Sequence, residues 1–192
     1  MGAKERPGAG GAAAAVRILD AAVDALVEHG AGALAMHDVA SRAGVSKGLI
    51  HYHYHDKDAL LADVVVRLGE RIAARERAAL ARSVAASVVD DLRRWMEGER
   101  SAGEWRALSS LLQWPAGPVA RAAREALRER RVAAAGMMAH VFALLAVRPH
   151  IAPEQMGALV ATAVCGLAVG PGDAEDRAAM DVLVLALLGT GE

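Results

Sequence analysis

The residues best suited to chemistry lie between positions 46 and 57. This segment holds three histidines, both tyrosines and two of the chain's three lysines, and it has no acidic residue from Ser46 to His55. Hydroxyl, imidazole and ammonium groups donate hydrogen bonds to phosphate oxygens and to base edges. The residue types in this segment therefore indicate contact with nucleic acid.

A turn joins two short helical patterns at this point in the chain. Met36–Ala43 has apolar residues at helical spacing, and Gly44-Val45-Ser46 leads from it to a second short helix over 46–54. Glycine permits the sharp turn, and serine can cap the helix that follows. Two helices joined in this way predict a helix-turn-helix, whose second helix is narrow enough to enter the major groove of DNA.

Other chemistries find less support in the sequence. His51 and His55 share a helical face, but His53 points elsewhere and no third ligand is evident, so we expect no metal site. The sequence shows no Ser/His/Asp order, no phosphate-binding glycine loop and no carboxylate pair at a pocket. We therefore predict a protein that is not an enzyme and has no cofactor.

The composition favours an all-helical fold. The chain has 192 residues, of which 3% are aromatic, and alanine, the best helix former, is abundant. A formal net charge of -1 restricts any binding of nucleic acid to a local surface. One cysteine rules out an internal disulfide framework. No segment suits a signal peptide or a membrane span, so we expect a cytoplasmic protein without membrane contact.

Hydrophobic periodicity and the turn residues divide the chain into elements. We expect helices over 12–30, 36–43, 46–54, 56–80, 84–97, 104–113, 118–147, 153–170 and 174–188. Residues 1–11 are predicted to be a disordered arm, 12–57 a DNA-binding domain with its helix-turn-helix over about 36–54, and 58–80 a connecting helix. Residues 81–192 are predicted to bind a ligand and to form a dimer.

The stretch 39–61 resembles the signature of the TetR family of bacterial transcriptional regulators, and the likeness extends over about 12–72. The later residues are only loosely similar to the BetI-type subgroup. The resemblance implies a dimer that binds double-stranded operator DNA and responds to an unidentified small-molecule effector. The residues expected to serve DNA binding are His37, Ser46, Lys47, Gly48, Leu49, His51, Tyr52, His53 and Lys57. Ala35 stands where the family commonly has a capping Thr or Ser, so that cap is expected to be lost.

Two features of the later residues bear on the ligand and the dimer. All three tryptophans lie within one short span; they are either ordinary core residues or part of an adaptable pocket, and the resemblance favours a pocket. The residues proposed for it are Trp95, Trp105, Leu108, Trp114, Met138 and Phe142.

The last two helical segments are apolar nearly all round, which favours burial against a second chain over a monomer core. The residues expected in that interface are Leu159, Val160, Ala163, Val164, Leu167, Val182 and Leu185.

The most concrete interpretation is a dimeric, ligand-responsive transcriptional regulator that acts as a repressor. Two alternatives stay open at the level of sequence. One is a TetR-like protein that has lost DNA binding and acts through protein contacts, and the other is an enzyme.

Overall fold

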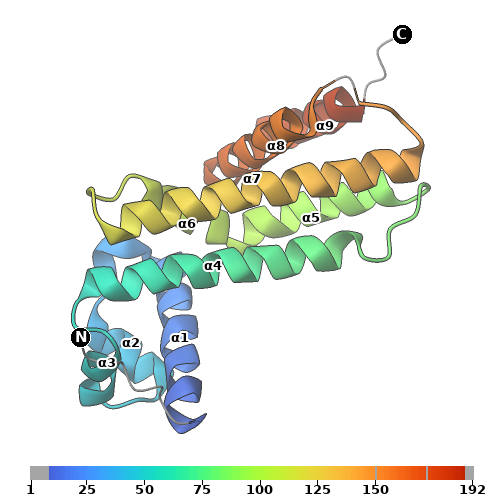
Figure 1. The fold of residues 1–192 in the computed structure, drawn as a ribbon. Coiled ribbons are helices and arrows are strands. Elements are labelled where there is room, and N and C mark those ends of the chain that lie inside the picture. The colour runs from blue at the N-terminus through green and yellow to red at the C-terminus, as the bar shows by residue number, and fades with distance from the viewer. Residues whose placement is uncertain (1–8, 150, 172, 189–192) are drawn as a thin grey trace.

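The computed structural model describes residues 9–149, 151–171 and 173–188, and within these ranges the chain forms helices and no β-strand. The helices are α1 (Ala9–Ala33), α2 (Met36–Ala43), α3 (Lys47–His53), α4 (Lys57–Leu80), α5 (Val88–Ala102), α6 (Glu104–Leu112), α7 (Pro118–Leu145), α8 (Pro153–Val169) and α9 (Ala174–Leu188). The predicted all-helical fold class is confirmed. Figure 1 shows α1, α2 and α3 as a small lobe at the N-terminal end of α4, with the remaining helices gathered along α4 as a larger bundle.

Local capping chemistry sets the ends of the short helices. Gly44 ends α2 in the left-handed conformation (φ 64°), and the N–H of Val45 donates to the carbonyl of Ala40 at 3.0 Å. The Ser46 hydroxyl accepts the N–H of Leu49 at 3.1 Å, and the Asp56 carboxylate accepts the N–H of Ala59 at 2.7 Å. The cap predicted at Ser46 is thus confirmed, and the two side chains fix where α3 and α4 begin.

The apolar face of α4 is the spine of the fold. Its buried stripe has no exposed surface and contains Leu60, Leu61, Val64, Val65, Leu68 and Ile72. The stripe follows the three- and four-residue spacing of a helix, and α4 packs against α1 at one end and against α5, α6 and α7 further along. The small lobe is thus attached to the bundle through α4 and through α1, which also packs directly on α6.

Three arginines spaced four residues apart on α4 tie the small lobe to the bundle. The Arg67 guanidinium donates to both carboxylate oxygens of Asp20 on α1, at 2.8 and 3.2 Å. Arg71 donates to Asp20 at 2.9 Å and to Asp24 at 2.8 Å. These hydrogen bonds lower the pKa of the Asp20 carboxyl, chiefly through Arg67, and hold α1 against α4.

The third arginine, Arg75, serves two acids on other helices. It donates to Glu99 of α5 through two bonds, at 2.7 and 2.9 Å, and it also pairs with Glu104 of α6. Glu99 is 1% exposed and Glu104 is 5% exposed, so both carboxylates depend on α4 for a counter-charge. The ionic contacts therefore join four helices around the middle of α4.

The observed helix ends correct two sequence predictions. We expected a helix over 84–97, but α5 begins at Val88 because the hydroxyls of Ser83 and Ser87 both donate to Asp91, at 2.7 and 2.9 Å, and hold a turn before it. The helix then continues through Gly98 and ends at Gly103, whose φ of 75° stops it.

The first helix also differs from its expected bounds. Residues 1–8 of the predicted arm lie outside the described residues, and 9–11 belong to α1. The helical path breaks at Gly30 as expected (φ 78°, ψ 164°), but helical residues continue to Ala33. Among the described residues, no helix is long and apolar enough to cross a membrane.

Candidate nucleic-acid interface

The outer face of α3 presents the polar residues singled out in the sequence. Lys47, Gly48 and His51 are exposed, and Tyr52 retains 76% of its surface. Ile50 on the opposite side is fully buried and anchors the helix to the lobe. A short, acid-free helix is thus held by its apolar side while its polar side faces outward, as groove binding requires.

The remaining residues of α3 have mixed surroundings. The Ser46 hydroxyl is engaged in the cap, and Leu49 is half-buried. His53 is half-buried, with its ring 5.4 Å from that of Tyr52 in an edge-on arrangement and 6.4 Å from that of Tyr54. Tyr54 is buried, which raises the pKa of its hydroxyl to about 12. The Tyr54 ring thus packs the end of α3 against the core of the lobe, while Tyr52 stays exposed.

The histidines near α3 do not converge. His51 is exposed, His53 lies between the two tyrosines, and His55 pairs with Asp56 at 2.7 Å. Within the described ranges, no group of three possible metal ligands occurs. On α2, His37 is exposed and lies 2.9 Å from the carboxylate of Asp38.

The local charge of this surface is small because its arginines are engaged elsewhere. Arg42 donates to both oxygens of Glu28 on α1, at 2.9 and 2.6 Å, and these bonds lower the pKa of the Glu28 carboxyl. Arg17 donates to the carbonyl of Ala43 at 3.4 Å. At the start of α2, Ala35 provides no side-chain cap, and only its carbonyl accepts bonds from the first turn. Lys47 is consequently the cation that α3 itself supplies.

Lys57 occupies a junction between the lobe and the bundle. Its ammonium donates to the carbonyl of Gly32 at 3.4 Å and lies 6.0 Å from the centre of the Trp114 ring. The Trp114 indole N–H donates to the carboxylate of Asp58 at 3.3 Å. Trp114, one of the proposed pocket residues, thus lies half-buried at the first turn of α4.

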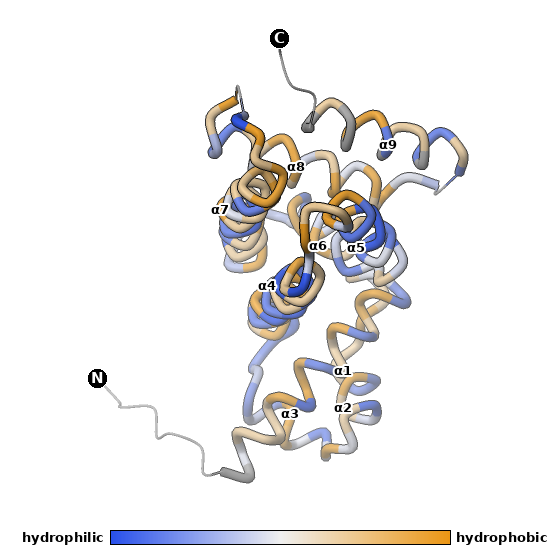
Figure 2. The backbone as a smooth tube through the Cα atoms, turned by 90° about the vertical axis from the view of Figure 1, so that its right-hand side faces the viewer, coloured by the Kyte–Doolittle hydropathy of each residue, from blue (hydrophilic) through white to orange (hydrophobic). Residues whose placement is uncertain are grey.

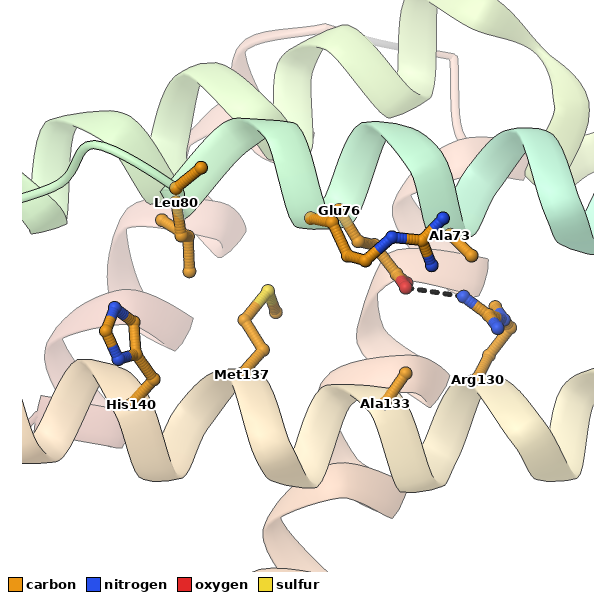
Figure 3. A pocket seen from close by; sticks show the side chains of 9 residues that line it. Ala73, Glu76, Leu80, Arg130, Ala133, Met137 and His140 are labelled. Carbon is orange, nitrogen blue, oxygen red and sulfur yellow. Dashed lines mark hydrogen bonds and ion pairs between the residues drawn. The ribbon is translucent and has the colours of Figure 1, made fainter.

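A cavity that the sequence analysis did not predict lies between α4 and α7. It has a volume of about 420 Å³ and is lined by Ala73, Glu76, Arg77, Leu80, Ala81, Arg130, Ala133, Met137 and His140. In Figure 3, Glu76 of α4 and Arg130 of α7 meet across it, with a bond of 2.5 Å between Oε2 and Nη1. Burial raises the pKa of Glu76 to about 7, although Arg130 opposes the shift.

A smaller cavity of about 210 Å³ lies where α7 approaches the start of α8. Met138 and Phe142, two of the proposed pocket residues, are part of its lining. The other three, Trp95, Trp105 and Leu108, line neither cavity and are buried in the core.

The residues proposed for the dimer interface fall into two groups. Leu159 and Val182 are 46% and 64% exposed, and Ala163 and Leu167 are half-buried. Val160 and Val164 are 2% and 3% exposed, because they pack within the chain. They therefore have little surface left for a second chain. The side chain of Leu185 lies outside the described residues.

Comparisons with known proteins agree with the geometry of the small lobe. Residues 18–64 match the family model of bacterial regulatory proteins, tetR family. An HTH-type transcriptional repressor of Mycobacterium tuberculosis is 38% identical over 58 residues, which cover 30% of this chain and 31% of that protein. The match thus spans about a third of the length of that relative.

Solved structures resemble the chain over nearly its whole length. A TetR-family transcriptional regulator from Agrobacterium tumefaciens has a TM-score of 0.71 at 15% identity, covering 93% of this chain and 100% of that one. Bacillus subtilis FadR, solved with stearoyl-CoA, has a TM-score of 0.64 at 14% identity, covering 92% and 99%. At these identities the likeness shows a shared fold.

Proposed function

Because the chain belongs, through its N-terminal helices, to the TetR family of bacterial regulatory proteins, we propose that it is a cytoplasmic transcriptional repressor. It binds a near-palindromic operator as a dimer and leaves the DNA when a small-molecule effector binds. The observation that carries this proposal is the exposed, acid-free face of α3, which is anchored by the buried Ile50.

The proposed roles on DNA divide into attachment and readout. The side chains proposed to attach the protein to the phosphate backbone are those of Lys47, Tyr52, His53 and Lys57. The side chains proposed to read base edges in the major groove are those of His37, Lys47, Leu49 and His51. Ser46 and Gly48 lie at the start of α3, where the helix comes closest to the DNA.

The dimer is proposed to form through α8 and α9. Figure 2 shows these helices side by side at the end of the molecule opposite α2 and α3. The exposed apolar surface of Leu159 and Val182 supports this assignment. A two-fold dimer presents its two α3 helices to half-sites about 34–36 Å apart on DNA, and its symmetry calls for matching symmetry in the operator.

The effector is proposed to act through α4. The stearoyl-CoA held by FadR illustrates that this fold can hold a small molecule, and the cavity between α4 and α7 gives this chain a place for one. Glu76 lies 19 residues after Lys57, or about 28 Å along α4. A ligand that binds one position of α4 more tightly than another shifts the equilibrium toward that position, and with it the spacing of the two α3 helices. The size of the shift in the equilibrium is limited by the difference between its two affinities.

The test is to incubate the purified protein with genomic DNA fragments and to sequence those retained. Recovery of a common near-palindromic sequence is expected, with affinity that falls as salt rises because phosphate contacts release counterions. Lys47→Ala should reduce the salt slope by about one. Arg124→Ala, which removes an exposed cation from α7, serves as the control and should leave binding unchanged. A protein that retains no fragment at low salt would refute the proposal.

A second candidate function is favoured by the start of α2. Ala35 offers no side-chain cap there, and this suits a TetR-like protein that acts through protein contacts without DNA. The same retention experiment separates the two candidates, since the second predicts no enriched sequence at any salt concentration.

A further inference from the structure

The cavity between α4 and α7 has the charge and shape to select a class of ligand. We propose that it binds an amphipathic organic carboxylate, with the carboxylate at Arg77 and Arg130 and the apolar chain between Leu80 and Met137. The inference rests on the proposed function, because it names the chemical class of the effector.

The first observation is the charge balance of the lining. Its ionisable side chains comprise two guanidiniums, one carboxylate and one imidazole, from Arg77, Arg130, Glu76 and His140. Glu76 is bonded to Nη1 of Arg130. Among the described residues, no carboxylate lies within ion-pair distance of Arg77, so the cavity has a cation without a matched anion. An anionic headgroup complements this surplus.

The second observation is the burial of the polar end. Glu76 and Arg130 are 9% and 8% exposed, and the Arg130 Nε–H is buried without a hydrogen-bond partner in the described chain. A buried ion pair is seldom needed for stability, because apolar residues of similar volume often serve as well. A polar group at the wall of an otherwise apolar cavity instead orients a ligand.

The third observation is the apolar part of the lining. Ala73 and Leu80 of α4, and Ala81 directly after it, line the cavity together with Ala133 and Met137 of α7, and Figure 3 shows Leu80 and Met137 pointing toward each other there. From Ala73 to Ala81 the lining extends about 12 Å along α4. This surface suits an alkyl or aryl chain that continues from the headgroup.

The surroundings of Glu76 predict how pH affects binding. Burial and the buried Glu99 of α5 raise its pKa, whereas Arg130 of α7 and Arg77 of α4 oppose the rise. An incoming carboxylate adds negative charge beside Glu76 and favours its protonation. Binding of an anion should therefore take up a proton and weaken as the pH rises from 6 to 8. A cation would show the opposite trend.

Three probes with the same alkyl chain test the headgroup. Isothermal titration of the full chain with octanoate, 1-octanol and octylammonium should show octanoate binding at least about tenfold more tightly than the others. Equal affinity for octanol, or tighter binding of octylammonium, would overturn the inference.

Variants then locate the headgroup. Arg77→Gln, at an exposed position, should weaken octanoate binding by about tenfold. Glu76→Gln, which mimics the protonated acid, should retain binding and depend less on pH than the wild type, since the His140 imidazole remains in the lining. The double variant Glu76→Gln with Arg130→Gln leaves no buried charge unpaired and should lose octanoate selectivity. Arg124→Gln removes an exposed arginine from α7, the helix that carries Arg130, and is the matched control. It should bind octanoate as the wild type does.

Unchanged octanoate affinity in both Arg77→Gln and the double variant would contradict the assignment. The retention of DNA is measured separately, so the failure of one proposal can be told from the failure of the other. If the protein selects an operator but does not prefer octanoate, only the proposal of a carboxylate ligand is refuted. If the protein binds octanoate as expected but retains no DNA, the proposal that it is a DNA-binding repressor is refuted.

Discussion

Replacing Arg75 by methionine should destabilise the chain far more than the same change at Arg71, one turn earlier on α4. Arg75 donates two hydrogen bonds to Glu99, which is 1% exposed, so its removal leaves a buried carboxylate without its main partner. Breaking a buried pair from one side costs about 3–5 kcal/mol. The comparison separates the effect of burial from that of charge, because both substitutions remove one guanidinium from the same helix.

The carboxylates that pair with Arg71 keep other partners when Arg71 is removed. The Asp24 side chain is 50% exposed and can be hydrated, while Asp20 keeps Arg67 and Glu104 keeps Arg75. Because each acid keeps either water or a second arginine as a partner, the cost should be about 1 kcal/mol, at the upper end for surface pairs. For a chain of this length, about 2–4 °C of melting temperature corresponds to each kcal/mol. Arg75→Met should therefore lower the melting temperature by about 6–20 °C, and Arg71→Met by about 2–4 °C.

Thermal unfolding followed by far-ultraviolet circular dichroism measures both values. Protein concentrations must be equal, because association would add its own stabilisation. The double variant Arg75→Met with Glu99→Met should recover most of the loss, since it replaces the pair by apolar side chains. Equal shifts for the two single variants, or a double variant as unstable as Arg75→Met, would refute the reasoning.

Three further predictions concern the turn, the DNA contacts and the buried acid. Gly44→Ala should lower the free energy of unfolding by about 1 kcal/mol in urea titration, because Gly44 has a φ of 64°; an unchanged value would show that the turn relaxes. Lys57→Ala should weaken binding to all DNA sequences alike in mobility-shift titrations, whereas His51→Ala should relax the choice at one base pair. If both variants changed affinity alone, this division of roles would be wrong. Between pH 4.5 and 7, wild-type stability should fall relative to that of Glu76→Gln as pH rises. The reason is that the folded-state pKa of about 7 exceeds the ordinary 4.5, so the folded chain binds the extra proton. Denaturant titrations at several pH values check this, and parallel curves for the two proteins would contradict it.

The helices and the nucleic-acid face could be predicted because their signals are local. Gly44 and Ser46 determine the turn through their own backbone and side chain, and the spacing of Leu61, Val65 and Leu68 identifies the buried side of α4. The start of α5 was misplaced because it depends on two serine hydroxyls meeting one carboxylate, Asp91. Residue types alone did not distinguish that turn from a first helical turn.

The cavity was missed because it depends on which inward faces meet. Glu76 follows Ile72 by one turn and precedes Leu80 by one turn, so a carboxylate interrupts an apolar stripe. Arg130 interrupts the stripe of Ala126 and Ala134 on α7 in the same way. Both interruptions were visible in the sequence. Periodicity gives the side of each helix but not its partner, and the pairing of the two charges required the packing of α4 on α7.

The position of Trp114 gives this molecule a built-in optical reporter. Its indole touches the first turn of α4 through Asp58 and lies beside the ammonium of Lys57, whereas Trp95 and Trp105 are enclosed by the core. A displacement of that turn changes the polarity around one emitting ring and leaves the other two nearly undisturbed. Intrinsic fluorescence, with Trp114→Phe as the blank, can thus follow the hinge between the lobe and the bundle without an attached label.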